Sequence, residues 1–166
     1  MNNRNLSYVC FCFVLFFGIL NLNAQSKKKL KKYQVKYIDE TITKKTDGLE
    51  ETFKDVLMKV DFEGNVIEMT QFKKDGSMKS KTLSKYNKNG DLIQEEELDG
   101  GLKLKSRKTM SFNIDGEKIS ESEFDNLNRL IKKSIYIYDS KGFKVEKQVF
   151  DGNGKLILSK KIKYMN

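Results

Sequence analysis

Apolar residues recur along this chain at a fixed distance before glycine, and this pattern sets the architecture that we predict. An aromatic or aliphatic residue stands four positions before a glycine at Val60–Gly64, Phe72–Gly76, Tyr86–Gly90, Phe112–Gly116, Tyr138–Gly142 and Phe150–Gly154. Phe124 has Asn128 in the glycine position, and Leu98 is followed early by Gly100 and Gly101. From Phe72 the apolar anchors fall at 72, 86, 98, 112, 124, 138, 150 and 164, in alternating steps of 14 and 12. The repeat unit is therefore 26 residues long, with two anchors and two turns.

The anchors form two columns. Phe72, Leu98, Phe124 and Phe150 make one column, and Tyr86, Phe112, Tyr138 and Tyr164 make the other. The segments between the turns alternate apolar and polar residues, as in 134–138 and 156–164, and none carries a helical period. Because residues i and i+2 share a face of a strand, Met110/Phe112, Tyr136/Tyr138 and Ile162/Tyr164 are expected to form an apolar stripe.

The residues between each anchor and its glycine are typical of tight hairpin turns. Asp or Asn follows most anchors, where its side chain can cap a type I turn. The fourth position needs a residue that accepts positive φ and closes a G1-type bulge. We assign this structural role to Gly64, Gly76, Gly90, Gly116, Asn128, Gly142 and Gly154.

These patterns predict an all-β fold over residues 33–166, an antiparallel hairpin meander of about ten strands. Segments 33–43 and 49–60 form the first hairpin around Asp47-Gly48. The low apolar content favours an open, twisted single sheet, while a sandwich or a partly closed roll stays open as an alternative.

The N-terminus has the pattern of a secretory signal peptide. Arg4 precedes an apolar run over residues 8–20, which is shorter than the roughly 20 residues of a spanning helix. We expect residues 1–24 to be removed near Ala24, with a retained membrane anchor as the alternative. The product would be periplasmic or secreted, without a stable transmembrane anchor. Residues 25–32 are expected to be a disordered basic tail.

The composition limits the catalytic and binding groups that the chain can offer. The chain has no His, Pro or Trp, and Cys10 and Cys12 lie within the expected signal peptide. The exported product would therefore lack thiolate and imidazole groups, which excludes Ser-His-Asp and Cys-His catalysis. We predict no catalytic residue, metal site or cofactor. The formal net charge of +9 suggests an acidic neighbour, although lysines also keep exposed strands soluble.

Two groups of residues are candidates for binding. Lys103, Lys105, Arg107 and Lys108 form a basic segment that would meet an anionic polymer, or simply face solvent. Tyr136 and Tyr138 would stack sugar rings if exposed, or belong to the core if buried. Glu95 and Glu97 share a strand face about 6.6 Å apart, near the spacing of an inverting glycosidase. A solvated face paired with lysines explains them equally.

At Tyr138-Asp139-Ser-Lys-Gly142 and Phe150-Asp151-Gly-Asn-Gly154-Lys155-Leu156 the chain resembles the YD-repeat (RHS-like) pattern. It is also similar to bacterial MORN-like repeats with aromatic-x-x-Asn-Gly hairpins, over roughly residues 60–166. The short signal and the Lys/Asn-rich composition look like small exported proteins of Bacteroidetes-type bacteria. The resemblance implies hairpin architecture and transfers no catalytic residue.

We therefore expect a non-enzymatic binding or structural repeat module at the bacterial cell envelope. Its partner would be an envelope protein or an anionic glycan such as lipopolysaccharide, and no nucleic acid is expected. One alternative is a glycan hydrolase that uses carboxylates alone. Another is an antitoxin- or immunity-like protein that binds a partner protein by adding a strand to a sheet edge.

Overall fold

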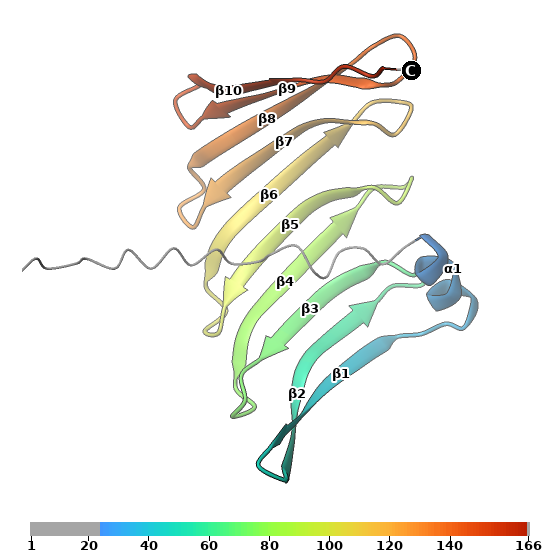
Figure 1. The fold of residues 1–166 in the computed structure, drawn as a ribbon, viewed down its shortest axis with the longest axis vertical. Helices are drawn as coiled ribbons and strands as arrows, with labels where there is room; N and C mark the ends of the chain where they lie inside the picture. The colour runs from blue at the N-terminus through green and yellow to red at the C-terminus, as the bar shows by residue number, and fades with distance from the viewer. Residues whose placement is uncertain (1–23, 166) are drawn as a thin grey trace, which may run out of the picture.

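The computed structural model describes residues 24–165, which form one helix followed by one ten-stranded antiparallel sheet (Figure 1). The expected signal peptide lies, except for Ala24, outside the described residues. The elements are α1 (Ala24–Lys32), β1 (Tyr37–Thr46), β2 (Leu49–Val60), β3 (Val66–Phe72), β4 (Met78–Tyr86), β5 (Leu92–Asp99), β6 (Leu104–Phe112), β7 (Lys118–Asp125), β8 (Leu130–Tyr138), β9 (Lys144–Asp151) and β10 (Leu156–Lys161).

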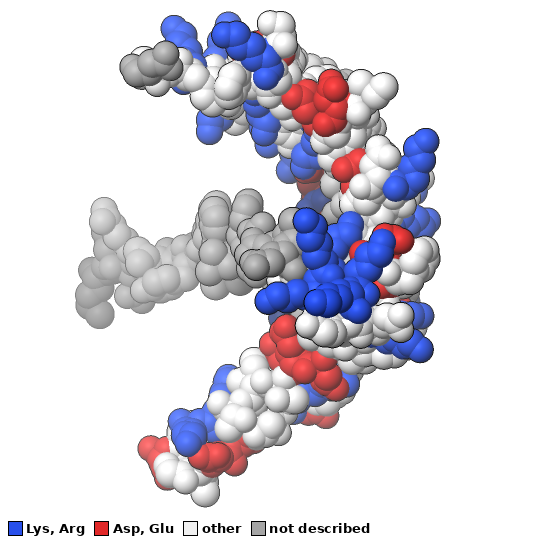
Figure 2. Space-filling model, turned by 90° about the vertical axis from the view of Figure 1, so that its right-hand side faces the viewer, with Lys and Arg blue, Asp and Glu red and all other residues white. Residues whose placement is uncertain are grey.

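Every strand pairs with the strands that precede and follow it in the chain, so the sheet order is the sequence order. β1 and β10 are the two edges, and the sheet does not close into a barrel. Seen from its side, the sheet curves into an open arc (Figure 2). The predicted all-β meander with a single open sheet is confirmed, and neither a sandwich nor a roll is formed.

The two anchor columns lie on opposite faces of the sheet. Alternation along β4, β6 and β8, together with the strand register, places Tyr86, Phe112 and Tyr138 on one face. We call this the tyrosine face; it also carries Met69, Tyr136 and Val149. The other face, here the phenylalanine face, carries Phe72, Leu98, Phe124 and Phe150. The hairpins from β2–β3 to β9–β10 end in a register shift at the anchor residue or next to it, and this shift accommodates the bulge.

The apolar core is small, as the composition suggests. Val56, Met58 and Met69 form its buried cluster at β2 and β3, and Ile38 and Val66 pack against them. Among the described residues no large side chain is completely buried. Both faces of this single-layer sheet are accessible to solvent. The backbone hydrogen bonds between strands and the turns therefore contribute much of what fixes the fold.

All seven residues that we assigned to the turns adopt positive φ, including Asn128 at 63°. The hairpin between β5 and β6 keeps the same geometry, although its sequence looked irregular. Here Leu102, four residues after Leu98, takes the left-handed position with φ 64°, and neither Gly100 nor Gly101 does. The 26-residue register thus overrides the local preference for glycine.

The capping residues work as their side-chain chemistry predicts. In the hairpin between β8 and β9, Oδ1 of Asp139 accepts hydrogen bonds from the backbone N–H groups of Lys141 and Phe143, both 2.9 Å long. The same pair of bonds forms at Asp61, Asn87, Asp99, Asn113, Asp125 and Asp151. The β3–β4 turn has Lys73 at this position, and Asp75 instead binds Ser77.

The expectation of a disordered tail at residues 25–32 is wrong, because these residues belong to α1. The helix ends in lysines, which suit the negative end of its dipole. It docks on the β2–β3 turn, where Lys31 forms an ion pair with Glu63 at 2.6 Å. A Cβ on Gly64 would lie 2.5 Å from the carbonyl oxygen of Lys27, so this glycine allows the close approach. Contact with a distant turn was not visible in the local sequence pattern.

Candidate binding sites on the tyrosine face

The tyrosine column is tied to the backbone of the neighbouring strands. The hydroxyls of Tyr86, Tyr138 and Tyr164 donate to the carbonyls of Val66, Lys118 and Lys144 at 3.1, 3.0 and 3.2 Å. Each bond spans twenty residues of sequence. These bonds fix the rings along the edge of the sheet where the β2–β3, β4–β5, β6–β7 and β8–β9 turns lie. The column is therefore an ordered strip of aromatic rings.

A ring of three lysines surrounds Tyr136 in β8. The Nζ atoms of Lys118, Lys144 and Lys147 lie 5.3, 4.9 and 5.4 Å from the centroid of the Tyr136 ring. Lys118 comes from β7 and the other two from β9, so the strands on either side of β8 both contribute. Tyr136 itself is buried, at 9% exposure. We call Tyr136 with these three residues the lysine ring.

Acidic groups compensate the lysine ring only in part. Lys118 forms an ion pair with Glu121 at 2.6 Å. Burial alone would raise the pKa of Glu121, but the hydrogen bond and charge of Lys118, together with Lys108 and Lys147, hold this pKa below its ordinary value. Burial also opposes the charged form of Lys118, yet Glu121 keeps the pKa of Lys118 above its usual range. Lys118 is therefore cationic at neutral pH.

The structure places the predicted binding residue Tyr136 at the centre of the lysine ring and Tyr138 next to it on the same face. Sequence reasoning missed the lysines. The repeat register contains the signal, because Lys118 and Lys144 stand 26 residues apart at the start of successive odd strands. Lys147 occupies the position held by Glu121 one repeat earlier, so the final repeat exchanges an acid for a base.

The structure does not gather the predicted basic segment into one surface. Lys103 lies in the β5–β6 turn, where its N–H binds Asp99. Lys105 pairs with Glu97, and Arg107 lies over the Phe124 ring on the phenylalanine face, 4.7 Å from its centroid. Lys108 is on the tyrosine face, where it stands opposite Glu95 and Glu123. These four cations therefore point to different neighbours.

Glu95 and Glu97 do share a face, as the strand period predicts. Thr82, Ser106 and Lys108 surround them around a hollow of about 20 Å³. The pKa of Glu95 is raised above its ordinary value, mainly because the carboxyl group is buried. The charge of Lys108 opposes this rise, and the charges of Glu121 and Glu97 add to it. A hollow of this size has room for little more than one water molecule. The pair fits the description of a salt-bridged strand surface better than that of a sugar-binding cleft.

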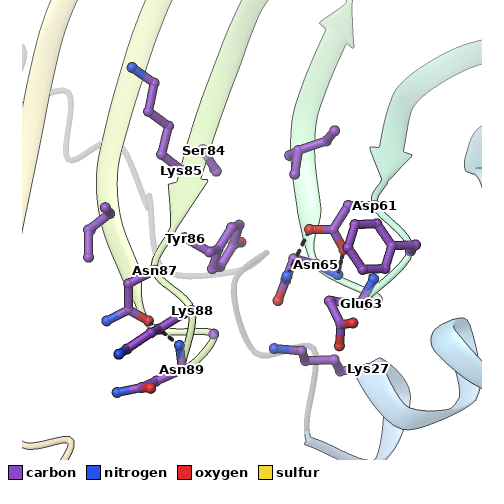
Figure 3. A pocket seen from close by; sticks show the side chains of 14 residues that line it. Lys27, Asp61, Glu63, Asn65, Ser84, Lys85, Tyr86, Asn87, Lys88 and Asn89 are labelled. Atoms are coloured by element: carbon purple, nitrogen blue, oxygen red, sulfur yellow. Dashed lines mark hydrogen bonds between the residues drawn. The ribbon is translucent and has the colours of Figure 1, made fainter.

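An open groove of about 720 Å³ lies at the turn edge of the sheet (Figure 3). Its walls are the β2–β3 and β4–β5 turns, and α1 borders it. Tyr86, the column residue of β4, lies between the two turns (Figure 3). Lys27 reaches from α1 across the groove, so that its Nζ would stand 2.7 Å from a Cβ on Gly90. Ile67 and Ile93 give it an apolar lining.

Among residues 24–165, no group of three or more acidic side chains is arranged to hold a metal ion. No helix in the same range has the length and apolar content needed to cross a membrane.

Comparisons with known proteins give little guidance. No protein-family model matches the chain, and no curated protein does. A crystal structure of TarM is similar with a TM-score of 0.30 and 16% identity, over 84% of this chain and 24% of TarM. The structure of a mutant of S. aureus TarM in complex with fondaparinux, alpha-GlcNAc-glycerol and UDP is similar with a TM-score of 0.31 and 15% identity. The match covers 81% of this chain and 23% of that one.

The Photorhabdus luminescens Tc holotoxin pore matches with a TM-score of 0.24 and 7% identity, over 78% of this chain and 10% of that one. This chain thus spans a quarter or less of each of these proteins. Likeness at this level carries no argument about function. The resemblance to YD-repeat and MORN-like proteins stays a prediction from the sequence.

Proposed function

We propose that this protein is an exported, non-enzymatic binding module of the bacterial envelope whose tyrosine face holds an anionic glycan. The observation that carries the proposal is the lysine ring, in which three cations from two strands converge on one aromatic side chain. Three cations gathered around one ring would offer an anionic ligand several contacts of opposite charge.

The chemistry of the ring suits an acidic sugar. Cations above an aromatic face are attracted by its quadrupole, which holds the ammonium groups in place before a ligand arrives. The neighbouring Tyr138 adds an aromatic surface of the kind on which sugar rings stack. Carboxylate, phosphate or sulfate groups on the glycan would then bind the ammonium groups by charge-assisted hydrogen bonds.

The repeat suits a polymer rather than a single sugar. Column residues on successive even strands are separated by two inter-strand spacings, about 9.6 Å. Tyr86, Phe112, Tyr138 and Tyr164 therefore present a regular series of rings along the sheet edge. The groove beside Tyr86 and the lysine ring at Tyr136 lie on the same face, so one extended chain would reach both.

The test measures the binding of residues 25–166 to anionic envelope glycans at low and high salt. A triple variant, Lys118→Gln, Lys144→Gln and Lys147→Gln, removes the ring. The matched control is Lys79→Gln, Lys133→Gln and Lys155→Gln, which removes the same charge from three exposed positions. We expect salt-sensitive binding that the ring variant weakens about tenfold or more while the control stays within about twofold.

Two results would overturn the proposal. Equal losses in the ring variant and in the control would mean that net charge alone attracts the polymer. Absence of binding by the unmodified protein at both salt concentrations would mean that the tyrosine face does not hold such a glycan.

A further inference from the structure

The strands of the sheet alternate in charge. From β4 onward, each even strand contains basic residues and no acid: Lys79, Lys81 and Lys85 in β4, Lys105, Arg107 and Lys108 in β6, Lys132 and Lys133 in β8, and Lys160 and Lys161 in β10. The strand acids of this region all lie in the odd strands, most densely in β5 and β7. Each basic strand inside the sheet is therefore flanked by strands that carry acids.

β10 breaks this rule because it is an edge strand. It pairs with β9 and has no strand on its other side among the described residues. All six of its residues are exposed. The apolar side chains Leu156, Ile157 and Leu158 are 47, 57 and 49% exposed. This edge offers a row of backbone groups of the kind that binds another strand.

The strand register shows which charged group β10 lacks on its open side. Lys160 occupies the same repeat position as Lys108, two units of 26 residues earlier. Lys108 faces Glu95 on β5 and Glu123 on β7. Lys160 instead faces Lys147 on β9, a like-charge pair that is unfavourable when directly opposed. A carboxylate on the open side of β10 would give Lys160 the counter-charge that Lys108 has.

We propose that the free edge of β10 accepts an acidic, extended segment of a partner protein, which pairs with it as an additional antiparallel strand. The pairing follows the register of β6 with β7, so that a glutamate of the partner faces Lys160 as Glu123 faces Lys108. Backbone hydrogen bonds supply the affinity, and the acidic positions select the partner. This proposal is independent of glycan binding on the tyrosine face.

A second copy of the chain fits this edge less well. The acidic strands of such a copy, β5 and β7, are already paired on both sides. Its other free edge, β1, is bulged between Glu40 and Thr41 and carries Lys44 and Lys45 beside its acids. The charge alternation therefore favours a different, acidic chain.

The experiment uses peptides taken from the chain itself. A labelled peptide with the sequence of residues 116–127 contains β7 and supplies the acidic pattern that the register requires. A second peptide replaces Glu121 and Glu123 by Lys. Two further peptides carry N-methyl groups at alternate residues, so that each blocks one edge of the added strand. Binding to residues 25–166 is followed by fluorescence anisotropy, and protection of the β10 amides by hydrogen exchange.

We expect the acidic peptide to bind and to protect the β10 amides, and we expect only one of the two N-methylated peptides to lose binding. Lys160→Glu should weaken binding about tenfold or more, whereas Lys79→Glu, on the interior strand β4, should not. Equal binding of both N-methylated peptides, or unchanged affinity in Lys160→Glu, would overturn strand addition. A concentration-dependent dimer of the protein that the peptide cannot displace would assign the edge to a second copy instead. Loss of glycan binding in the lysine-ring variant leaves these results untouched.

Discussion

The hydroxyl of Tyr138 donates a 3.0 Å hydrogen bond to the carbonyl oxygen of Lys118, twenty residues earlier in the chain. Tyr86 and Tyr164 make the same bond with Val66 and Lys144. The hairpin repeat therefore fixes a tertiary hydrogen bond as well as a strand register. One member of the column, Phe112, has no hydroxyl with which to make it.

Phe112→Tyr should complete the series. The new hydroxyl would face the carbonyl of Leu92, which stands twenty residues earlier as in the other members. Because the ring position is already set, we expect a gain of about 1 kcal/mol in the free energy of unfolding. Urea denaturation measures it, and Tyr138→Phe is the matched control, expected to lose a similar amount. Destabilisation by Phe112→Tyr would contradict the equivalence of the column positions.

Leu102→Gly should stabilise the protein. Leu102 holds φ at 64°, a conformation that costs a side chain with a Cβ about 1–2 kcal/mol relative to glycine. Leu102 is more than half exposed, so little packing is lost. We expect a higher urea midpoint with an unchanged m-value. Asn128→Gly, with φ 63°, is the comparison and should gain less, because asparagine tolerates this region. A lower midpoint for Leu102→Gly would refute strain at this turn.

Docking of α1 should depend on Gly64 more than on an equivalent turn glycine. Gly64 and Gly76 share a φ of 81°, but a Cβ at Gly64 would meet the Lys27 carbonyl at 2.5 Å while one at Gly76 meets nothing within 4 Å. Gly76→Ala should cost about 1–2 kcal/mol from the backbone alone. Gly64→Ala should cost more and should expose the lysines of α1 to trypsin. Equal protection of α1 in both variants would show that the helix does not rest on this turn.

Acid stability should depend on the turn carboxylates. Backbone N–H groups of Lys103 and Gly101 bind Asp99 and lower its pKa, and Arg129 does the same for Asp125 through backbone and side chain. Groups with lowered folded-state pKa contribute stability above the unfolded value, and that contribution is lost as the pH falls below about 4.

The double variant Asp99→Asn and Asp125→Asn should therefore lose stability less steeply on acidification, because the amide oxygen does not titrate. Asn87 and Asn113 already cap two turns in this way. The measurement is the urea midpoint from pH 6 down to about pH 2.5, the range in which aspartates titrate. If the urea midpoint of the double variant fell with pH as steeply as that of the unmodified protein, these two carboxylates would not account for the loss of stability in acid.

The fold was predictable because the 26-residue repeat places the same kinds of residue at equivalent positions of successive hairpins. Anchor, capping residue and positive-φ position together define strand length and turn, and even the turn at Leu102 follows that register. The same register extends the tyrosine column to Val60. The helix at residues 24–32 was not predictable, since it is short and rich in lysine and its contact at Gly64 is distant in sequence.

The candidate site was predictable only in part. Tyr136 and Tyr138 were identified from their apolar alternation, but the lysines that surround Tyr136 come from two other strands. Conversely, consecutive cations such as Arg107 and Lys108 point to opposite faces and to different partners. Runs of charge along a strand therefore say less about a binding surface than equivalent positions in successive repeats.

The most direct test of the account follows the aromatic signals of individual tyrosines by NMR while an anionic glycan is added to residues 25–166. We predict saturable shifts at Tyr136 and Tyr138 that high salt reverses, with no change at Tyr37 on the far edge strand β1. Shifts confined to Tyr33 beside the lysines of α1, with Tyr136 unaffected, would contradict binding at the lysine ring.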